Sequence, residues 1–311
     1  MRITILGAGA LGCYFGAHLQ RAGHEVTYVA RGGQLAALQA GGVRVESPTS
    51  NFAVEKVRAV GTLAEAGAFD LLLFTIKNYD VAAVAAELPA VMGPDSVVMS
   101  VQNGVAAPGI LAEAVGEARV LPGVVYMPAD IKEPGVVRVT AELQGLLFGE
   151  YAGPPTARTR AIFEALAVEG LRVTLADDIW RVLWEKFIML SSFAAITGVT
   201  RLDIGPIRET PETRALLRQL VGEVAAVAHA EHPSVSADIA DSSFGLLVDN
   251  LPPAAHASLL DDLQRGKRLE LDWLSGEVIR RGRKLGIATP AHGFVYAALA
   301  PYAAGPPGSR G

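Results

Sequence analysis

The chain of 311 residues carries a formal net charge of −5, is 50% hydrophobic and 19% charged, and contains a single cysteine. These values predict two globular domains and exclude an intramolecular disulfide framework or a cysteine-based metal site. The acidic balance argues against nucleic acid as a partner. No apolar run approaches the roughly 18 residues of a membrane-spanning helix, so we expect no membrane segment. The single cysteine, Cys13, fits a reducing cytoplasm, where we expect the protein to reside.

The first predicted elements form a strand, a glycine turn, a helix and a second strand within about 30 residues. The strands cover residues 2–6 and 24–30, and the helix covers 10–22 and ends at Gly23. A signal peptide is the alternative interpretation, because Arg2 precedes an apolar stretch, but glycines interrupt that stretch. The pattern favours the minimal parallel crossover unit.

Strands and helices then alternate up to residue 177. Buried strands are predicted at residues 71–76, 96–101, 120–126 and 172–175, with helices at 80–88, 109–115 and 157–169. Two shorter strands, 136–139 and 146–148, are predicted as an antiparallel extension at the edge of the sheet. This alternation predicts an α/β fold with a Rossmann-type, doubly wound sheet.

Beyond Asp177 the pattern is helical, with almost no strand signal. The predicted helices cover residues 179–196, 212–231, 237–248 and 270–285. We therefore predict a Rossmann domain over residues 1–177, an all-helical domain over 178–304 and a disordered, Pro- and Gly-rich tail over 305–311.

A dinucleotide-binding motif follows the first strand and opens the first helix. Its six residues are Gly7, Ala8, Gly9, Ala10, Leu11 and Gly12. Gly7 permits the tight turn, Gly9 lets the backbone approach a pyrophosphate, and Gly12 lets helix and strand pack closely, while the helix N-terminus offers donors to the phosphates. A packing turn without a ligand is the alternative.

The end of the second strand indicates which dinucleotide is bound. An NAD site usually has Asp or Glu about 20 residues past the glycines, to hold the ribose 2′-OH. No carboxylate lies between Val26 and Gln34, and Arg31 is a planar cation suited to a 2′-phosphate. The sequence therefore favours NADPH, with a solvated surface arginine as the alternative.

Two further short motifs follow predicted strands, where ligands of open α/β sheets bind. They are Thr75-Ile76-Lys77 and Gln102-Asn103-Gly104. Considered alone, Lys77 and Asn103 could equally be turn residues. Together with the glycine motif and Arg31, however, they make the chain resemble the ketopantoate reductase (2-dehydropantoate 2-reductase) family, from the first glycine to Thr289-Pro290. The resemblance implies that Lys77 and Asn103 lie near the nicotinamide and the substrate.

The resemblance extends to the helical domain. Trp184-Glu185-Lys186 matches the segment whose lysine is the family's general acid, and Ser258 and Glu270 have the family's spacing of twelve residues. The resemblance implies that Lys186 and Glu270 are catalytic, with Glu270 bound to the substrate hydroxyl, and that Ser258 helps to hold the carboxylate. Considered alone, Lys186 would be a solvated helix residue and Glu270 an exposed acid near a helix N-terminus.

One departure from the family pattern concerns the substrate. The family lysine is usually followed at i+4 and i+8 by asparagines, but here these positions are Leu190 and Ala194. Ser191 and Ser192 cannot replace them, because at 100° per residue they point away from the Lys186 face. The departure predicts a preference for bulkier or more hydrophobic 2-oxo acids.

The sequence therefore predicts NADPH-dependent reduction of 2-dehydropantoate to pantoate, in pantothenate and coenzyme A synthesis. A related D-2-hydroxy acid dehydrogenase and a non-catalytic NADPH-binding sensor are the alternatives. We expect a small 2-oxo acid as the substrate and no nucleic acid or membrane partner, with a homodimer as a candidate assembly. We expect no metal, because His229 and His232 have helical spacing but no evident third ligand, and a helix end before Pro233 explains them.

Overall fold

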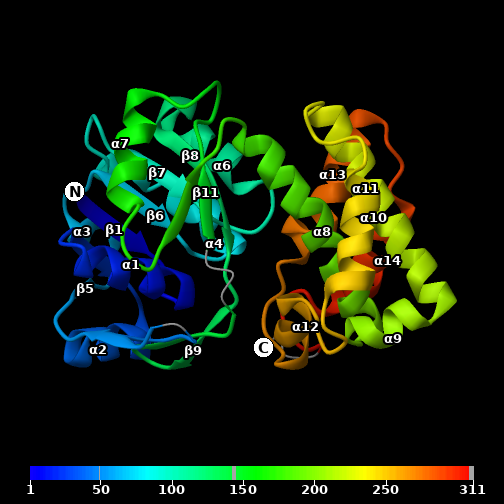
Figure 1. Ribbon diagram of the computed structural model, residues 1–311, viewed down its shortest axis with the longest axis horizontal. Helices are drawn as coiled ribbons and strands as arrows, with labels where there is room; N and C mark the ends of the chain where they lie inside the picture. The colour runs from blue at the N-terminus through cyan, green and yellow to red at the C-terminus, as the bar shows by residue number, and fades with distance from the viewer. Residues whose placement is uncertain (49, 142–144, 308–311) are drawn as a thin grey trace. The chain divides into compact units, whose positions relative to one another are not determined.

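The computed structural model describes residues 1–48, 50–141 and 145–307, and divides into two compact units. The sheet unit comprises Met1–Asn103 and Ala107–Ile179, and the helical unit comprises Gly104–Ala106 and Trp180–Gly311 (Figure 1). Of the tail predicted to be disordered, residues 308–311 lie outside the described residues.

The sheet unit is built on an eight-stranded sheet with the order β12-β11-β8-β7-β6-β1-β2-β5. Its strands are β1 (Arg2–Leu6), β2 (Glu25–Val29), β5 (Arg58–Val60), β6 (Leu71–Phe74), β7 (Val97–Ser100), β8 (Val120–Tyr126), β11 (Gly145–Phe148) and β12 (Arg172–Leu175). All neighbours pair in parallel except β8 and β11. The predicted α/β fold of Rossmann type is confirmed.

Helices cover both faces of this sheet. They are α1 (Ala10–Arg21), α2 (Gly32–Gly41), α3 (Leu63–Ala66), α4 (Asn78–Ala85), α5 (Leu88–Val91), α6 (Ala107–Val115) and α7 (Ala157–Leu166). Ile3 and Ile5 of β1 join a core with α1, α2 and α7, whereas Leu6 joins a second core with α3 to α6. Because both faces are buried, the central strands are continuous apolar runs instead of alternating patterns.

A second, four-stranded sheet with the order β4-β3-β10-β9 corrects one prediction. Its strands are β3 (Val43–Glu46), β4 (Phe52–Val54), β9 (Ala129–Glu133) and β10 (Val136–Val139). Residues 136–139 therefore do not extend the main sheet, and only β11 does so. A two-residue turn at Pro134-Gly135, with φ +83° at Gly135, pairs β10 with β9 instead.

Helices make up the second unit, and the described part of that unit contains no strand. They are α8 (Ile179–Thr200, which begins at the last residue of the sheet unit), α9 (Ile204–Glu209), α10 (Pro211–Glu231), α11 (Ile239–Gly245), α12 (Ser258–Gln264), α13 (Ser275–Leu285) and α14 (Pro290–Leu299). The helix predicted over 270–285 begins only at Ser275. Before it lies the 3-10 turn Leu271–Trp273, so Glu270 precedes a short turn and not a long helix.

Helix α8 bears on the expectation that the chain has no membrane segment. Among the described helices, it alone is long and apolar enough to cross a membrane by length and composition, with a mean hydropathy of 1.4 over its most apolar window. However, 67% of that window is buried inside the protein, and Trp184, Phe187 and Ile188 are among its fully buried residues. This burial is typical of a core helix.

Candidate active site

The glycine turn joins β1 to α1 with the geometry that a dinucleotide phosphate requires. Gly7 has φ +95°, and the backbone N–H groups of Gly7 and Ala8 donate to the Val29 carbonyl oxygen at 3.2 and 3.0 Å. A Cβ atom on Gly12 would lie 2.6 Å from the Gly7 carbonyl oxygen, whereas one on Gly9 would meet nothing closer than 4.0 Å. The helix packs tightly on the strand while the exposed Gly9 leaves the N-terminus of α1 open, which fits a bound pyrophosphate.

The turn lies where the connections of the sheet change direction. From β1 the chain proceeds to β2 and β5 on one side, and then to β6, β7 and β8 on the other. The Thr75 hydroxyl, just past β6, donates to the carbonyl oxygens of Leu6 and Gly7 at 3.0 and 2.7 Å. Its side chain therefore fixes the two strand ends at the position where open α/β sheets bind ligands.

Gln102, just past β7, ties the next pair of strand ends together. Its side-chain amide donates to the carbonyl oxygens of Phe74 and Ile76 at 2.6 and 3.1 Å, and its own oxygen accepts the Ser100 hydroxyl at 2.7 Å. The sequence motifs contain Thr75 and Gln102, but sequence reasoning gave neither of them a role. A polar residue directly after a buried strand was the available signal.

The structure brings the segments of Lys77 and Asn103 together. Lys77 is exposed and precedes the first residue of α4, while Asn103 is half-buried past β7. The Asn78 side-chain amide donates to the Asn103 backbone carbonyl at 2.9 Å. Both predicted residues therefore stand at the carboxyl edge of adjacent strands in the sheet unit.

Arg31 occupies the same edge on the other side of β1. It follows β2, is exposed, and caps α2 from an extended backbone conformation with φ −130° and ψ 159°. Gly32 and Gly33 come next, and a Cβ on Gly32 would contact nothing within 4 Å. The guanidinium thus belongs to an open segment that suits a 2′-phosphate.

In the helical unit, Lys186 lies on α8 beside the buried Trp184 and Phe187, whose ring centroids are 5.7 Å apart. Burial lowers the pKa of the Lys186 ammonium from its ordinary value to about 8. A lysine that titrates near neutral pH is suited to proton transfer, because it holds a proton at pH 7 and releases it readily.

The face of α8 that follows Lys186 is apolar, as the sequence indicates. Leu190 is half-buried and Ala194 is only 1% exposed. Ser191 and Ser192 are fully buried, and their hydroxyls donate to the carbonyl oxygens of Phe187 and Ile188 at 2.7 and 2.8 Å. Both hydroxyl protons are engaged by the helix backbone and do not replace the missing asparagines.

Ser258 and Glu270 occupy two other segments of the helical unit. Ser258 is the exposed first residue of α12, and Glu270 is a half-buried residue before the 3-10 turn Leu271–Trp273. Neither position is a core position, so both side chains can reach solvent.

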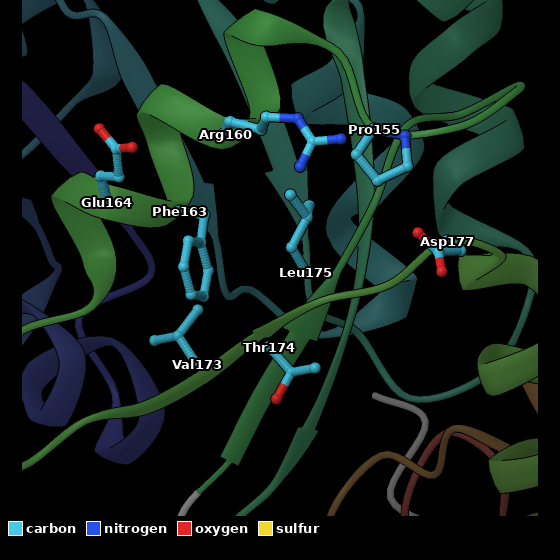
Figure 2. Close-up of a pocket in the computed structure, with 8 residues that line it drawn as sticks. All are labelled: Pro155, Arg160, Phe163, Glu164, Val173, Thr174, Leu175 and Asp177. Carbon is cyan, nitrogen blue, oxygen red and sulfur yellow. The ribbon is translucent and has the colours of Figure 1, made fainter.

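A cavity in the sheet unit lies at the edge of the sheet away from the glycine turn. Figure 2 shows it between α7 and β12, where Arg160, Phe163, Val173 and Leu175 are among the lining residues, and its volume is about 460 Å³. Strand β12 is the outer strand, with β11, β8, β7 and β6 between it and β1. This cavity is therefore separate from the glycine turn.

Within the residues that the structure describes, no group of three or more His, Cys, Asp or Glu side chains could hold a metal ion. His229 Nε2 lies 2.8 Å from the Ser236 carbonyl oxygen, and His232 is the residue at which α10 ends. These two histidines therefore have structural contacts at a helix terminus.

Two family models match the chain. The model described as "Ketopantoate reductase PanE/ApbA" matches residues 3–153, and the model described as "Ketopantoate reductase PanE/ApbA C terminal" matches residues 178–303. The first match contains the glycine turn, Arg31, Lys77 and Asn103, and the second contains Lys186.

Related proteins that align with nearly the whole chain support the same family. A 2-dehydropantoate 2-reductase of Archaeoglobus fulgidus is 32% identical over 92% of both chains, and the uncharacterized oxidoreductase YkpB of Bacillus subtilis is 28% identical over 98% of this chain and 99% of its own. The crystal structure of a PanE/ApbA family ketopantoate reductase from Ralstonia eutropha JMP134 has a TM-score of 0.89 and 31% identity, covering 97% of this chain and 98% of that one. The chain therefore belongs to the ketopantoate reductase family, whose members are NADPH-dependent oxidoreductases acting on 2-oxo acids.

Proposed function

We propose that this protein reduces 2-dehydropantoate to pantoate with NADPH, a step in pantothenate and coenzyme A synthesis. The observation that carries the proposal is Lys186, a lysine with a pKa of about 8 in the part of the chain that matches the family's C-terminal model. The 32% identity to a 2-dehydropantoate 2-reductase over 92% of both chains supports the choice of substrate.

The sheet unit supplies the cofactor site in this proposal. The open N-terminus of α1 at Gly9 binds the pyrophosphate, and Arg31 binds the 2′-phosphate. Lys77 and Asn103 orient the nicotinamide and the substrate from the adjacent strand ends. When bound, NADPH supplies the hydride that reduces the C2 carbonyl of the 2-oxo acid.

The helical unit supplies the proton in this proposal. The Lys186 ammonium donates a hydrogen bond to the C2 carbonyl oxygen, stabilises the negative charge that develops there and transfers the proton that completes the alcohol. Glu270 binds the resulting hydroxyl and Ser258 the substrate carboxylate. Together these groups would distinguish a 2-oxo acid from a simple ketone.

A second candidate is reduction of a more hydrophobic 2-oxo acid to a D-2-hydroxy acid. The observation that favours it is the apolar face of Leu190 and Ala194, where the family pattern has two asparagines. An apolar surface binds a hydrophobic side chain more favourably than the hydroxyl-bearing side chain of 2-dehydropantoate.

The decisive experiment follows NADPH absorbance while the protein is offered a series of 2-oxo acids, including 2-dehydropantoate and phenylpyruvate. The proposal expects the highest kcat/KM for 2-dehydropantoate. A higher value for phenylpyruvate would select the second candidate, and no turnover of any acid, with NADPH binding intact, would identify a non-catalytic sensor.

The substitution Leu190→Asn tests whether α8 sets the substrate preference. We expect it to raise the kcat/KM ratio of 2-dehydropantoate to phenylpyruvate about ten-fold, because one amide regained for a substrate hydroxyl contributes about 1.4 kcal/mol. Leu190 is preferable to Ala194, since an asparagine at the buried Ala194 would bury an amide. Met189→Asn is the matched control, being half-buried on the same helix but rotated by 100°. An equal change of the ratio in both variants would contradict the assignment.

Three expectations stay predictions. They are the NADPH-binding and substrate-binding roles of residues 1–177 and 178–304, the cytoplasmic location and the homodimer. A ketopantoate reductase from Staphylococcus aureus whose structure is similar is described as dimeric, which supports testing the last of them. Light scattering of the purified full chain measures its mass directly, and twice the mass of one chain is the result we expect.

A further inference from the structure

The side-chain amide of Gln34 joins three segments of the sheet unit. Its Nε2 donates to the Ala8 carbonyl oxygen at 2.9 Å and lies 3.3 Å from Cys13 Sγ, and its Oε1 accepts the backbone N–H of Gly135 at 3.1 Å. One amide group therefore contacts the glycine turn, helix α1 and the turn between β9 and β10.

The contact with Ala8 fixes a peptide group within the glycine turn. The same carbonyl oxygen lies 3.2 Å from Cys13 Sγ, so two donors converge on it, and Ala8 is buried. With its carbonyl held from inside the protein, the Ala8–Gly9 peptide cannot rotate freely. The direction of the first N–H groups of α1, which face the proposed pyrophosphate, then depends in part on Gln34.

The position of Gln34 in the sequence links this turn to Arg31. Gln34 lies three residues after Arg31, in the first turn of α2, where the Leu35 N–H donates to the Arg31 carbonyl at 3.4 Å. Between them, Gly32 has φ +55° and Gly33 has no contact closer than 4.0 Å from a built Cβ. Two adjacent glycines give the start of α2 more backbone freedom than other residues would, so hydrogen bonds of the next side chain add to its restraint.

We infer that Gln34 is a positioning residue that sets the distance between Arg31 and the glycine turn, and thereby the preference of the site for NADPH over NADH. The inference rests on the cofactor site of the proposed function. Without the hydrogen bonds of Gln34, Arg31 moves with the free start of α2. The Arg31 guanidinium then spends less than half of its time in the geometry of a bidentate contact with the 2′-phosphate.

The test measures equilibrium binding of NADPH and NADH to the full chain and to Gln34→Leu, by nucleotide fluorescence. We expect the ratio of the NADH Kd to the NADPH Kd to fall about ten-fold, because part of one charged contact is lost. Adenosine 2′,5′-bisphosphate and AMP, which lack the nicotinamide and differ from each other only in the 2′-phosphate, should show the same change in their ratio when they displace the bound NADPH. Gln34→Met, with a side chain of similar length, repeats the measurement if the leucine variant does not fold.

Two controls separate positioning from a general effect on stability. Gln39→Leu removes another glutamine of α2, whose amide donates to the Ala59 carbonyl at 3.1 Å, and it should leave the ratio unchanged. In an Arg31→Ala background, Gln34→Leu should cause no further fall in the ratio. A lower melting temperature with an unchanged ratio, or an equal fall in the Arg31→Ala background, would overturn the inference.

Failure of the inference can be distinguished from failure of the proposed function. If the wild-type protein prefers NADPH but reduces no 2-oxo acid, the proposed reaction is contradicted. The ratio of the NADH Kd to the NADPH Kd of Gln34→Leu would still decide the role of Gln34. Preference of the wild-type protein for NADH would overturn both the 2′-phosphate site and the role of Gln34.

Discussion

Replacing Lys186 with alanine is expected to lower kcat for 2-oxo acid reduction by about a thousand-fold, because the site loses both its general acid and the cation that stabilises the developing oxyanion. The Kd of NADPH should change little, since the cofactor site lies on segments of the sheet unit. Single-turnover measurement of NADPH oxidation separates the chemical step from binding. A loss of less than about ten-fold would contradict the assignment of Lys186 as the acid.

The pH dependence gives an independent readout of the same residue. Because the pKa of Lys186 is about 8, its ammonium form predominates below pH 8 and is lost as the pH rises above this value. We therefore expect kcat/KM for reduction to be level below pH 8 and to fall about ten-fold per pH unit above it. Lys186→Arg, whose side chain stays charged, should be slow and should lack this alkaline decline.

The second large effect is expected at Glu277, whose loss should destabilise the protein by about 3 to 5 kcal/mol. Glu277 is only 1% exposed, on α13, and its Oε1 lies 2.5 Å from Arg281 Nε. Arg280 approaches its other oxygen, Glu231 also pairs with Arg281, and the Arg281 guanidinium lies 5.4 Å from the ring centroid of Trp184. Removing the buried carboxylate leaves the partly buried Arg281 with Glu231 alone of these two carboxylates, while the exposed Arg280 is solvated by water.

Urea denaturation of Glu277→Ala measures this loss. Asp241→Ala is the matched control, because Asp241 forms an exposed ion pair with Arg218 and its removal should cost no more than about 1 kcal/mol. Adding Arg281→Met to Glu277→Ala should recover part of the loss, since the partly buried cation that has lost one of its two carboxylate partners is then removed as well. A loss below about 1 kcal/mol in Glu277→Ala would show that water replaces the carboxylate.

The sequence predicted those parts of the fold in which local pattern and tertiary environment agree. The first crossover unit was predicted because β1 is a short apolar run before a glycine turn and an apolar helix. The sheet of β3, β4, β9 and β10 was not predicted as a sheet. The strand at β10 was predicted but assigned to the main sheet, and β9 is largely exposed, so apolar alternation does not mark it as a partner of β10.

The candidate site shows the same division. Its glycines and charged residues could be named from the sequence, because the residue type and its place after a predicted strand are enough to indicate their chemistry. The place after a strand also marked Thr75 and Gln102, but the roles of these two residues and of Gln34 could not be assigned, because they depend on which backbone carbonyl lies within reach. That information arises only when strands distant in the sequence become neighbours. The start of α13 at Ser275 was also missed, since the 3-10 turn before it has a helix-like sequence pattern.

The lowered pKa of Lys186 has a consequence for folding as well as for chemistry. In the unfolded chain this lysine titrates near its ordinary value of 10.5, so below pH 8 the folded protein must keep a charge in surroundings that disfavour it. The resulting penalty is on the order of 3 kcal/mol at neutral pH and is relieved between about pH 8 and 10.5. If Lys186 is the proton donor that we propose, an apolar residue there is expected to give a more stable but inactive protein, and the requirement for a proton donor then opposes thermal resistance at this position.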